Sequence, residues 1–326
     1  MALSRRNFLK GAAAGGAVAA SAAAPAAARE NKTLPPKAVG LLYDSTICVG
    51  CKACVKACRD ANDTQVEFNT AEPLWDTPLD ISGHTITVIK LYAEGTADHK
   101  DQERNGFAFI KKSCMHCVDP SCVSVCPVTA MTKHPETGIV SYEPGDCIGC
   151  RYCVASCPFG VPQFQYDTAF PKIVKCQLCK HRQVDGKLPA CAEVCPTGAT
   201  LFGPVVALRE EADRRRALPP GQPTTFSRKT VGSADTHEKA VARYVPHTYG
   251  VSEMGGTQML LLAGVPFDKL GYPALRERSY AAEAETLQGG IYTGMVAPIA
   301  LLAGLLFVAH RNTKHDADKP GADGED

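Results

Sequence analysis

The chain has 326 residues, 45% of them hydrophobic, and a formal net charge of +1. A chain of this length and apolar content can bury a core of its own, which argues against a small scaffold that depends on disulfides. The near-neutral charge leaves no basic excess for nucleic-acid binding. The 16 cysteines are unusual for such a chain, and their spacing has to indicate what they do.

The first segment has the pattern of an export signal. Arg5 and Arg6, in the stretch "SRRNFLK", precede a weakly hydrophobic run rich in Ala and Gly, and the alanines that end at Ala28 form a small-residue cleavage site. An alanine-rich disordered tail is the alternative. We predict a twin-arginine signal peptide over residues 1–28, which would carry an already folded protein to the periplasm.

The cysteines form four sets of four with none left over. Sets one and three follow C-x2-C-x2-C-x3-C, the bacterial ferredoxin spacing for iron–sulfur ligation. Sets two and four keep the leading C-x2-C and the trailing C-x3-C but have a longer middle spacing. In chain order the sets are Cys48, Cys51, Cys54 and Cys58; Cys114, Cys117, Cys122 and Cys126; Cys147, Cys150, Cys153 and Cys157; and Cys176, Cys179, Cys191 and Cys195.

This spacing suits a cubane cluster. Each iron takes one thiolate, so a tight loop can supply three ligands while the fourth approaches from the other side. The x3 step places the last cysteine of a set one helical turn further along, where it can face a neighbouring cluster. Proline follows that cysteine in sets two to four and ends the turn, whereas Arg59 follows Cys58.

Two other kinds of cysteine site compete with this interpretation. Zinc also binds paired Cys-x2-Cys motifs, but zinc sites seldom place four cysteines so close together in two separate sets. Disulfides suit the predicted compartment, but cysteines three residues apart make a poor disulfide framework in a chain with its own core. Iron–sulfur clusters therefore fit the pattern best.

Short predicted strands surround the motifs. The stretches "AVGLLYD" and "FAFIKK" and residues Ile139–Tyr142 lead into sets one, two and three, and "FGVPQFQYD" and "GATLFG" read as return strands. This internal repeat predicts an α+β fold with two ferredoxin-like modules, holding two clusters each, over residues 29–203. We expect the segment at about 60–105, with its strand-like "HTITVIKLY", to be an insertion that packs on the cluster core.

A C-terminal extension is predicted over residues 204–290. Within it "VVALREEADRRRAL" has a helical pattern and "MLLLAGVPF" favours a buried strand. Residues 291–309 contain no charge over 19 positions, which is enough to cross a bilayer, and Pro298 is tolerable in a spanning helix. A buried helix of a soluble protein is the alternative. A transmembrane helix there would hold the exported protein on the periplasmic side of the inner membrane and leave residues 310–326 as a cytoplasmic tail.

The motifs resemble those of the four-cluster, ferredoxin-like electron-transfer subunits that accompany molybdopterin enzymes and hydrogenases. The resemblance covers nearly the whole chain and is carried by "GLLYDSTICVGC", "DQERNGFAFIKKSCMHCVDPSCVSVCPV", "CIGCRYCVASCPF", "GGTQMLLLAGVPF" and "AGLLFVAHRNTKHD". It implies a position between a periplasmic nickel–iron hydrogenase, with its small and large subunits, and an integral membrane subunit that reacts with quinone.

The resemblance also implies how the ligands are shared among four 4Fe-4S clusters. Each cluster would take three cysteines from one set and the last cysteine of another. The implied sites are Cys48, Cys51 and Cys54 with Cys195; Cys176, Cys179 and Cys191 with Cys58; Cys114, Cys117 and Cys122 with Cys157; and Cys147, Cys150 and Cys153 with Cys126.

We expect an electron-transfer subunit and not an enzyme. No dinucleotide fingerprint and no nucleophile, metal-hydrolase or flavin motif stands out. His116 and several basic residues beside the ligands are candidates for tuning the cluster potentials, although solvent-exposed charges would look the same. The equivalent subunit of a formate dehydrogenase or reductase, and a non-redox scaffold held by metal, are the alternatives. The basic candidates are Lys52, Lys56, Lys111, Lys112, Arg151, Lys175 and Lys180.

Overall fold

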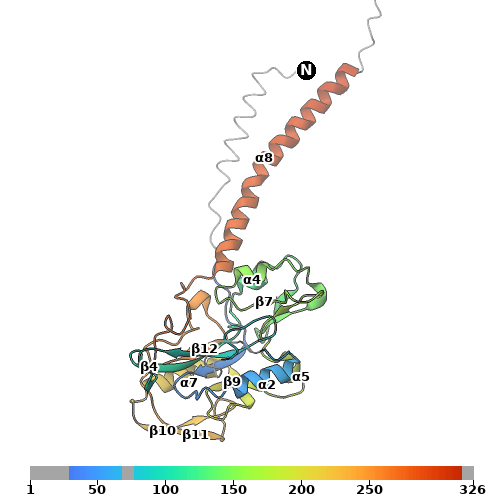
Figure 1. Cartoon of the computed structure of the whole chain (residues 1–326). Coiled ribbons are helices and arrows are strands. Elements are labelled where there is room, and N and C mark those ends of the chain that lie inside the picture. The colour runs from blue at the N-terminus through green and yellow to red at the C-terminus, as the bar shows by residue number, and fades with distance from the viewer. Residues whose placement is uncertain (1–28, 68–76, 318–326) are drawn as a thin grey trace, which may run out of the picture. The chain divides into compact units, whose positions relative to one another are not determined.

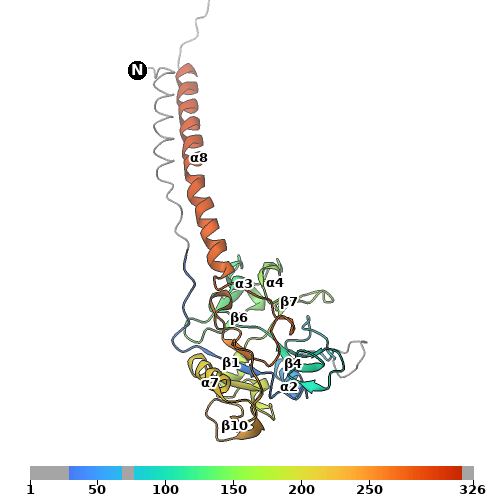
Figure 2. The ribbon, with the colours of Figure 1, turned by 90° about the vertical axis from the view of Figure 1, so that its left-hand side faces the viewer.

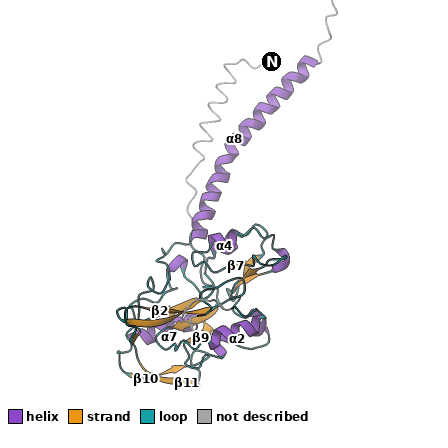
Figure 3. Ribbon diagram, viewed as in Figure 1, coloured by secondary structure: helices purple, strands orange, loops and turns teal. Residues whose placement is uncertain are grey.

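The computed structural model describes residues 29–67 and 77–317. The predicted signal peptide and most of the predicted tail lie outside these ranges. The described chain divides into a compact domain, Glu30–Ala281, and a second unit that contains the C-terminal helix. The domain is a mixture of short helices and small sheets joined by many loops (Figure 3), in agreement with the predicted mixture of helices and strands.

A three-stranded sheet joins segments from distant parts of the sequence. Strand β1 (Val39–Asp44) pairs antiparallel with β9 (Thr200–Pro204) and parallel with β12 (Met259–Leu262). Helix α7 (Val205–Ala217) packs against all three strands (Figure 1). The predicted helix and the predicted buried strand are both confirmed, and the strand β12 completes a sheet that begins at the other end of the domain.

Apolar side chains and a buried ion pair connect this sheet to α7. Leu42 and Leu208 are among the fully buried contacts. The guanidinium of Arg215 and the carboxylate of Asp44 are both inaccessible to solvent and lie 2.9 Å apart. Tyr244 also donates to this carboxylate, at 2.8 Å. Because an unpaired charge would be costly there, the pair commits α7 to one position on the sheet.

A second three-stranded sheet lies between the first two cysteine motifs. Strand β4 (Gly106–Lys112) is central, with β2 (Val88–Ala93) antiparallel on one side and β3 (His99–Lys100) parallel on the other. The predicted strands in "FAFIKK" and "HTITVIKLY" are therefore confirmed. Val88 and Ile89 are buried in the main core, so the described part of the predicted insertion contributes directly to the packing of the domain.

The helices that carry cysteines are short and pack in two pairs. Helix α2 (Ala53–Asn62) packs against α6 (Ala190–Glu193), and α3 (Ser121–Ser124) packs against α4 (Tyr152–Ser156). Figure 2 shows the second pair side by side. The pairing brings the first motif beside the fourth, and the second beside the third.

Short strands and turns connect these helices. The predicted strand at Ile139–Tyr142 is confirmed as β6, and the return strand after the third motif is reduced to the two residues of β7. A hairpin of β10 and β11 in the extension was not predicted. The remaining elements are β5 (Met131–Lys133), β6 (Val140–Tyr142), η2 (Pro144–Asp146), β7 (Gln163–Phe164), β8 (Ile173–Val174), α5 (Lys180–Val184), β10 (Pro223–Ser227), β11 (Thr236–Ala240) and η3 (Glu253–Gly255).

The second unit is dominated by helix α8 (Tyr280–Ala317). Its part from Tyr280 to His310 is long and apolar enough to cross a membrane by length and composition. The predicted spanning segment 291–309 lies within this part, and Pro298 lies inside the helix.

Candidate iron–sulfur centres

The four Cys-x2-Cys loops share one backbone conformation. In each loop the residue before the second cysteine has a left-handed backbone, with φ values of 69°, 48°, 72° and 51°. This turn reverses the chain so that its two cysteines can face the same side. Only two of the four residues are glycine, the residue that adopts such a conformation without strain. The four residues are Gly50, His116, Gly149 and Leu178.

The same turn directs backbone N–H groups at sulfur. Gly50 and Gly149 each donate to the first cysteine of their loop, with a nitrogen-to-sulfur distance of 3.4 Å. Leu178 donates in the same way to Cys176, at 3.3 Å. Hydrogen bonds of this kind stabilise thiolate over thiol. The loops are therefore built to present thiolates, which are the form of cysteine that binds metal.

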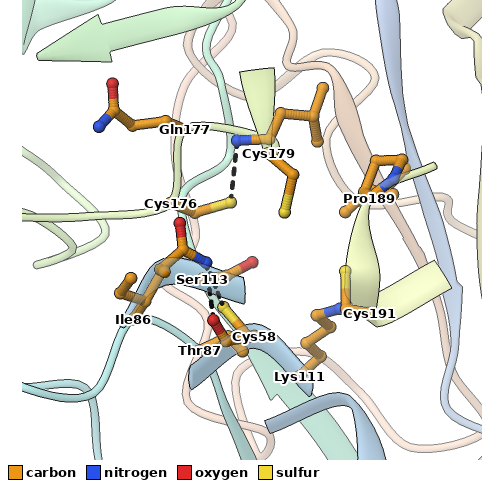
Figure 4. Close-up of a pocket in the computed structure, with 13 residues that line it drawn as sticks. Cys58, Ile86, Thr87, Lys111, Ser113, Cys176, Gln177, Cys179, Pro189 and Cys191 are labelled. Atoms are coloured by element: carbon orange, nitrogen blue, oxygen red, sulfur yellow. Dashed lines mark hydrogen bonds between the residues drawn. The ribbon is translucent and has the colours of Figure 1, made fainter. Parts of the chain in front are cut away.

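Cys58 lies with three cysteines of the fourth motif. Its side chain lines a small cavity together with Cys176, Cys179 and Cys191 (Figure 4). Burial raises the pKa of Cys58 well above its usual value, and the other three thiolates raise it further. Asn62, one turn along α2, approaches the Cys58 sulfur at 3.6 Å. We call these four cysteines the Cys58 group.

Cys195 lies with the cysteines of the first motif. Burial raises the pKa of Cys48, and the Cys195 thiolate adds to this effect. Burial likewise raises the pKa of Cys54 to about 12, with contributions from Cys191, Cys48 and Cys195. Cys51, in the same loop, is exposed. Cys48, Cys51, Cys54 and Cys195 are the Cys195 group.

Cys157 lies with the cysteines of the second motif. Burial raises the pKa of Cys117 well above its usual value, and Cys157, Cys122 and Cys114 raise it further. The pKa of Cys122 rises to about 12 for the same reasons, burial first and Cys114 and Cys157 after it. Cys114, Cys117, Cys122 and Cys157 are the Cys157 group.

Cys126 lies with the cysteines of the third motif. Burial raises the pKa of Cys153 to about 11, and Cys126, Cys147 and Cys150 contribute to the rise. Cys126 also accepts a hydrogen bond from the backbone N–H of Met131, at 3.5 Å. Cys126, Cys147, Cys150 and Cys153 are the Cys126 group, and Cys150 is its exposed member.

The four groups follow one another in space. Cys54 of the Cys195 group interacts with Cys191 of the Cys58 group. Cys176 of the Cys58 group interacts most strongly with Cys114 of the Cys157 group. Cys122 of the Cys157 group interacts with Cys153 of the Cys126 group. The order is therefore the Cys195, Cys58, Cys157 and Cys126 groups.

The residues fit polynuclear clusters better than single ions. Four buried thiolates repel one another, as their raised pKa values show, so a cationic core has to offset the repulsion before all four can ionise. In the part of the chain that the structure describes, no three His, Cys, Asp or Glu side chains converge on one ion position. A zinc ion needs such convergence, whereas the thiolates around a cubane each meet a different iron.

One of the seven basic candidates differs from the others. Lys111 is 1% exposed, and its ammonium nitrogen has no hydrogen-bond partner among the described residues. Burial opposes its charged form, but the thiolates of Cys191 and Cys54 outweigh this effect and raise its pKa above the usual value. Figure 4 shows its side chain beside Cys191.

The other six candidates have partners elsewhere. Lys52 contacts the carbonyl of Thr77, and Lys175 contacts that of Val140. Lys56, Lys112 and Lys180 pair with the carboxylates of Asp60, Asp80 and Glu143, respectively. The guanidinium of Arg151 lies 5.6 Å from the centre of the Phe164 ring. Lys175 also favours the thiolate of Cys122, but carbonyls occupy its nitrogen. Proximity in sequence therefore does not identify the buried cation that has neither a carbonyl nor a carboxylate partner.

His116 is buried inside the second motif. Its Nδ1 accepts a hydrogen bond from the backbone N–H of Val140, at 3.0 Å, which places the ring proton on Nε2. Burial lowers the pKa of His116 well below its usual value, with Lys175 and Lys133 adding to the effect, so the ring is neutral. Its Nε2 has no partner among the described residues. The ring therefore offers one free N–H donor beside the second motif.

Sequence reasoning missed the residues that hold this motif in place. Gln258 accepts from Lys133, at 2.8 Å, and donates to the backbone carbonyls of Val39 and Thr137. Its backbone N–H also reaches the carbonyl of Met115, at 3.1 Å. Gln258 immediately precedes the apolar run "MLLLAGVPF", which was the available signal. The extension therefore braces a cysteine loop that lies more than a hundred residues earlier.

Comparison with known proteins defines the class first. Residues 106–205 match the family described as a 4Fe-4S dicluster domain, which covers the second, third and fourth motifs. The chain is thus an iron–sulfur protein with 4Fe-4S centres.

Full-length relatives define the family more closely. The chain is 45% identical over 328 aligned residues to the hydrogenase-2 operon protein HybA of Escherichia coli O157:H7, and equally to that of Shigella flexneri, covering 99% of this chain and 100% of each relative. It therefore belongs to the HybA family. It is also 37% identical to the iron–sulfur subunit of the nitrate-inducible formate dehydrogenase of Escherichia coli K12, over 55% of this chain and 58% of that one.

Proposed function

We propose that this protein is the electron-transfer subunit of a periplasmic nickel–iron hydrogenase and relays electrons to a quinone-reactive membrane subunit through four 4Fe-4S clusters. The observation that carries the proposal is that the last cysteine of each motif lies with cysteines of another motif. Each group combines three cysteines of one motif with the last cysteine of another, as in two-cluster ferredoxins. The relation to HybA supports the hydrogenase partner.

We assign one cluster to each group. The ligands would be Cys48, Cys51, Cys54 and Cys195; Cys58, Cys176, Cys179 and Cys191; Cys114, Cys117, Cys122 and Cys157; and Cys126, Cys147, Cys150 and Cys153. Bound 4Fe-4S clusters supply one-electron chemistry. The protein holds the thiolates and directs N–H donors at sulfur.

The ends of the series suit contact with partners. Cys51 and Cys150 are exposed and belong to the first and last groups of the series. The apolar residue beside each, Val49 and Ile148, is also exposed, by 54% and 65%. One exposed end would therefore face the hydrogenase small and large subunits, and the other the membrane subunit.

Export and anchoring complete the proposal. The twin-arginine pattern of the sequence supports passage to the periplasm after cluster insertion. Helix α8 supports an anchor, because its part up to His310 is long and apolar enough to span a bilayer. Truncation before Ile291 should release the protein from carbonate-washed membranes while leaving its clusters intact. Removal of the full-length protein by the same wash would instead indicate a peripheral protein.

The central test is the composition of the complex purified anaerobically from solubilised membranes. Four cubanes require about 16 iron atoms per chain, one for each thiolate, and the clusters should be reducible and magnetically coupled. A nickel–iron hydrogenase should co-purify. Stoichiometric zinc with little iron would exclude the relay and favour a metal-stabilised scaffold.

A formate dehydrogenase partner is the second candidate, because the chain is also related to iron–sulfur subunits of that enzyme. The same purification separates the two. Hydrogen-dependent reduction of quinone by the complex supports the first candidate, and formate-dependent reduction supports the second.

A further inference from the structure

Lys111 is a buried cation in the space between two of the cysteine groups. It lies on β4, pairs with Ile89 across the sheet, and lines the same cavity as the four cysteines of the Cys58 group (Figure 4). The backbone carbonyl of Lys111 accepts a hydrogen bond from Tyr272, at 2.6 Å. The strand pairing and the hydrogen bond from Tyr272 therefore hold the backbone of Lys111 in place, and its side chain is directed toward the thiols.

The thiols that act on Lys111 belong to two groups. Cys191 and Cys176 are members of the Cys58 group, and Cys54 is a member of the Cys195 group. In return, Lys111 favours the thiolate forms of both Cys54 and Cys58. Its charge therefore acts on both sites at once.

Burying the ammonium group of Lys111 costs free energy, which indicates that a negative group compensates it in the assembled protein. A buried ammonium with neither a carboxylate nor a carbonyl partner is strongly unfavourable, and the described residues offer Lys111 only thiols, with Cys191 beside it. A cubane held by four thiolates is anionic and gains a further negative charge on reduction. Such a cluster supplies the negative charge that Lys111 lacks among the protein groups. The reduced cluster supplies one more negative charge than the oxidised cluster.

We propose that Lys111 is a positioning charge shared by the Cys58 and Cys195 centres, which stabilises their reduced states and raises both reduction potentials together. The inference rests on the proposed four-cluster relay. A shared cation lowers the energy of an electron on either of two adjacent centres. The difference between their reduction potentials therefore stays small, which favours electron transfer between them. The cysteines that act most on Lys111 do not belong to the two remaining centres, which should keep their potentials.

The neighbouring residue provides a matched control. Lys112 carries the same charge on the same strand, but its nitrogen lies 3.0 Å from Asp80 and its side chain is 25% exposed. Lys111→Gln and Lys112→Gln therefore remove the same charge at adjacent positions, one facing the thiols and one facing a carboxylate near solvent.

The test is a redox titration of the full-length protein, followed by the paramagnetic signals of its centres. Centres are assigned by their loss in Cys51→Ala and Cys58→Ala proteins. Lys111→Gln should destabilise the reduced form of the Cys58 and Cys195 centres at least tenfold, which lowers their reduction potentials by about 59 mV for a one-electron couple. Lys112→Gln should leave the reduction potentials of all four centres unchanged. Lys111→Arg, which keeps the charge, should stay near the wild-type potentials.

The outcomes separate the two proposals. Four assembled centres with unchanged potentials in Lys111→Gln, or an equal shift in all four, would overturn the role of Lys111 and leave the relay intact. Fewer than four centres in the wild-type protein would contradict the relay itself. If Lys111→Gln fails to assemble centres, Lys111→Arg decides: wild-type potentials support a role for the charge, and loss of the same centres shows that only packing matters.

Discussion

The two outer Cys-x2-Cys loops and the two inner ones reach the same backbone conformation by different means. The outer loops have glycine at the left-handed position, with φ values of 69° and 72°, and the inner loops have His116 and Leu178, with φ values of 48° and 51°. The inner residues are buried, with 1% and 2% exposure. A non-glycine residue in this region costs about 1–2 kcal/mol. Burial and hydrogen bonding have to offset that cost. The surrounding fold therefore stabilises the turn of the inner loops, whereas glycine allows the outer loops to adopt the same turn without such support.

The comparison extends to the clusters that the loops would hold. The outer loops end in the exposed Cys51 and Cys150, where partner proteins can approach. The inner loops carry side chains that reach into the core, and the two unpartnered donors, Lys111 and His116, lie beside the inner groups. Solvent access is therefore concentrated at the ends of the series, and the two donors lie beside its inner groups, although Lys111 also acts on Cys54 of the Cys195 group. Three changes test this division.

The largest effect should follow from removing a cysteine that links two motifs. Cys58→Ala should alter or abolish the centre that also depends on Cys176, because the two thiols line one cavity. The paramagnetic signals of Cys58→Ala and Cys176→Ala proteins should lack the same component, while Cys51→Ala should affect a different one. If Cys58→Ala and Cys51→Ala remove the same component, each motif binds its own cluster and the proposed sharing is wrong.

A smaller effect should separate the two outer glycines. A methyl group added at Gly50 would lie 2.4 Å from the ring of Phe109, whereas at Gly149 the nearest atom is 3.8 Å away, in Phe164. Gly149→Ala therefore bears only the backbone cost, about 1 kcal/mol. Gly50→Ala adds overpacking, about 1–3 kcal/mol. Thermal unfolding of the cluster-loaded proteins should show a clearly larger loss for Gly50→Ala.

The Gly149→Ala protein also tests the comparison itself. His116 and Leu178 show that the same backbone turn accepts a side chain when the surroundings fit it. Gly149→Ala should therefore keep all its clusters. A loss of the Cys126 centre in this variant would mean that glycine is required at the outer loops for more than its backbone freedom.

The sequence predicts the elements that local rules control. Cysteine spacing predicted the ligand sets, and alternating or apolar runs predicted β1, β4, β6, β9, β12 and α7. These features depend on neighbours within a few residues. The 4Fe-4S dicluster family confirms the cofactor type for the matched region, while the sharing of ligands stays a prediction from the resemblance.

The rest depends on contacts between distant segments. Strand β12 pairs with β1, more than two hundred residues earlier, and no local pattern specifies such a partner. Likewise, seven basic residues near the cysteines look alike in the sequence. Lys111 and Lys175 are both buried, and only hydrogen bonding distinguishes them, because the nitrogen of Lys175 is occupied by two carbonyls. Gln258 was overlooked because its partners come from three separate segments, around Val39, Met115 and Lys133 to Thr137.

The smallest expected effect concerns His116, whose Nε2–H has no partner among the described residues. Nδ1 is occupied by the backbone N–H of Val140, so only Nε2 can donate to a sulfur of a cluster held by the flanking Cys114 and Cys117. One hydrogen bond contributes about 1 kcal/mol, which should make the Cys157 centre roughly fivefold harder to reduce in His116→Phe. His134→Phe is the matched control, because His134 also accepts backbone N–H groups at Nδ1 but is exposed. Both variants lose a backbone contact and some stability, but only His116→Phe should shift a potential. An unchanged potential in His116→Phe would make His116 a structural support of its loop, and Lys111 would then be the remaining proposed tuning residue, acting on the Cys58 and Cys195 centres.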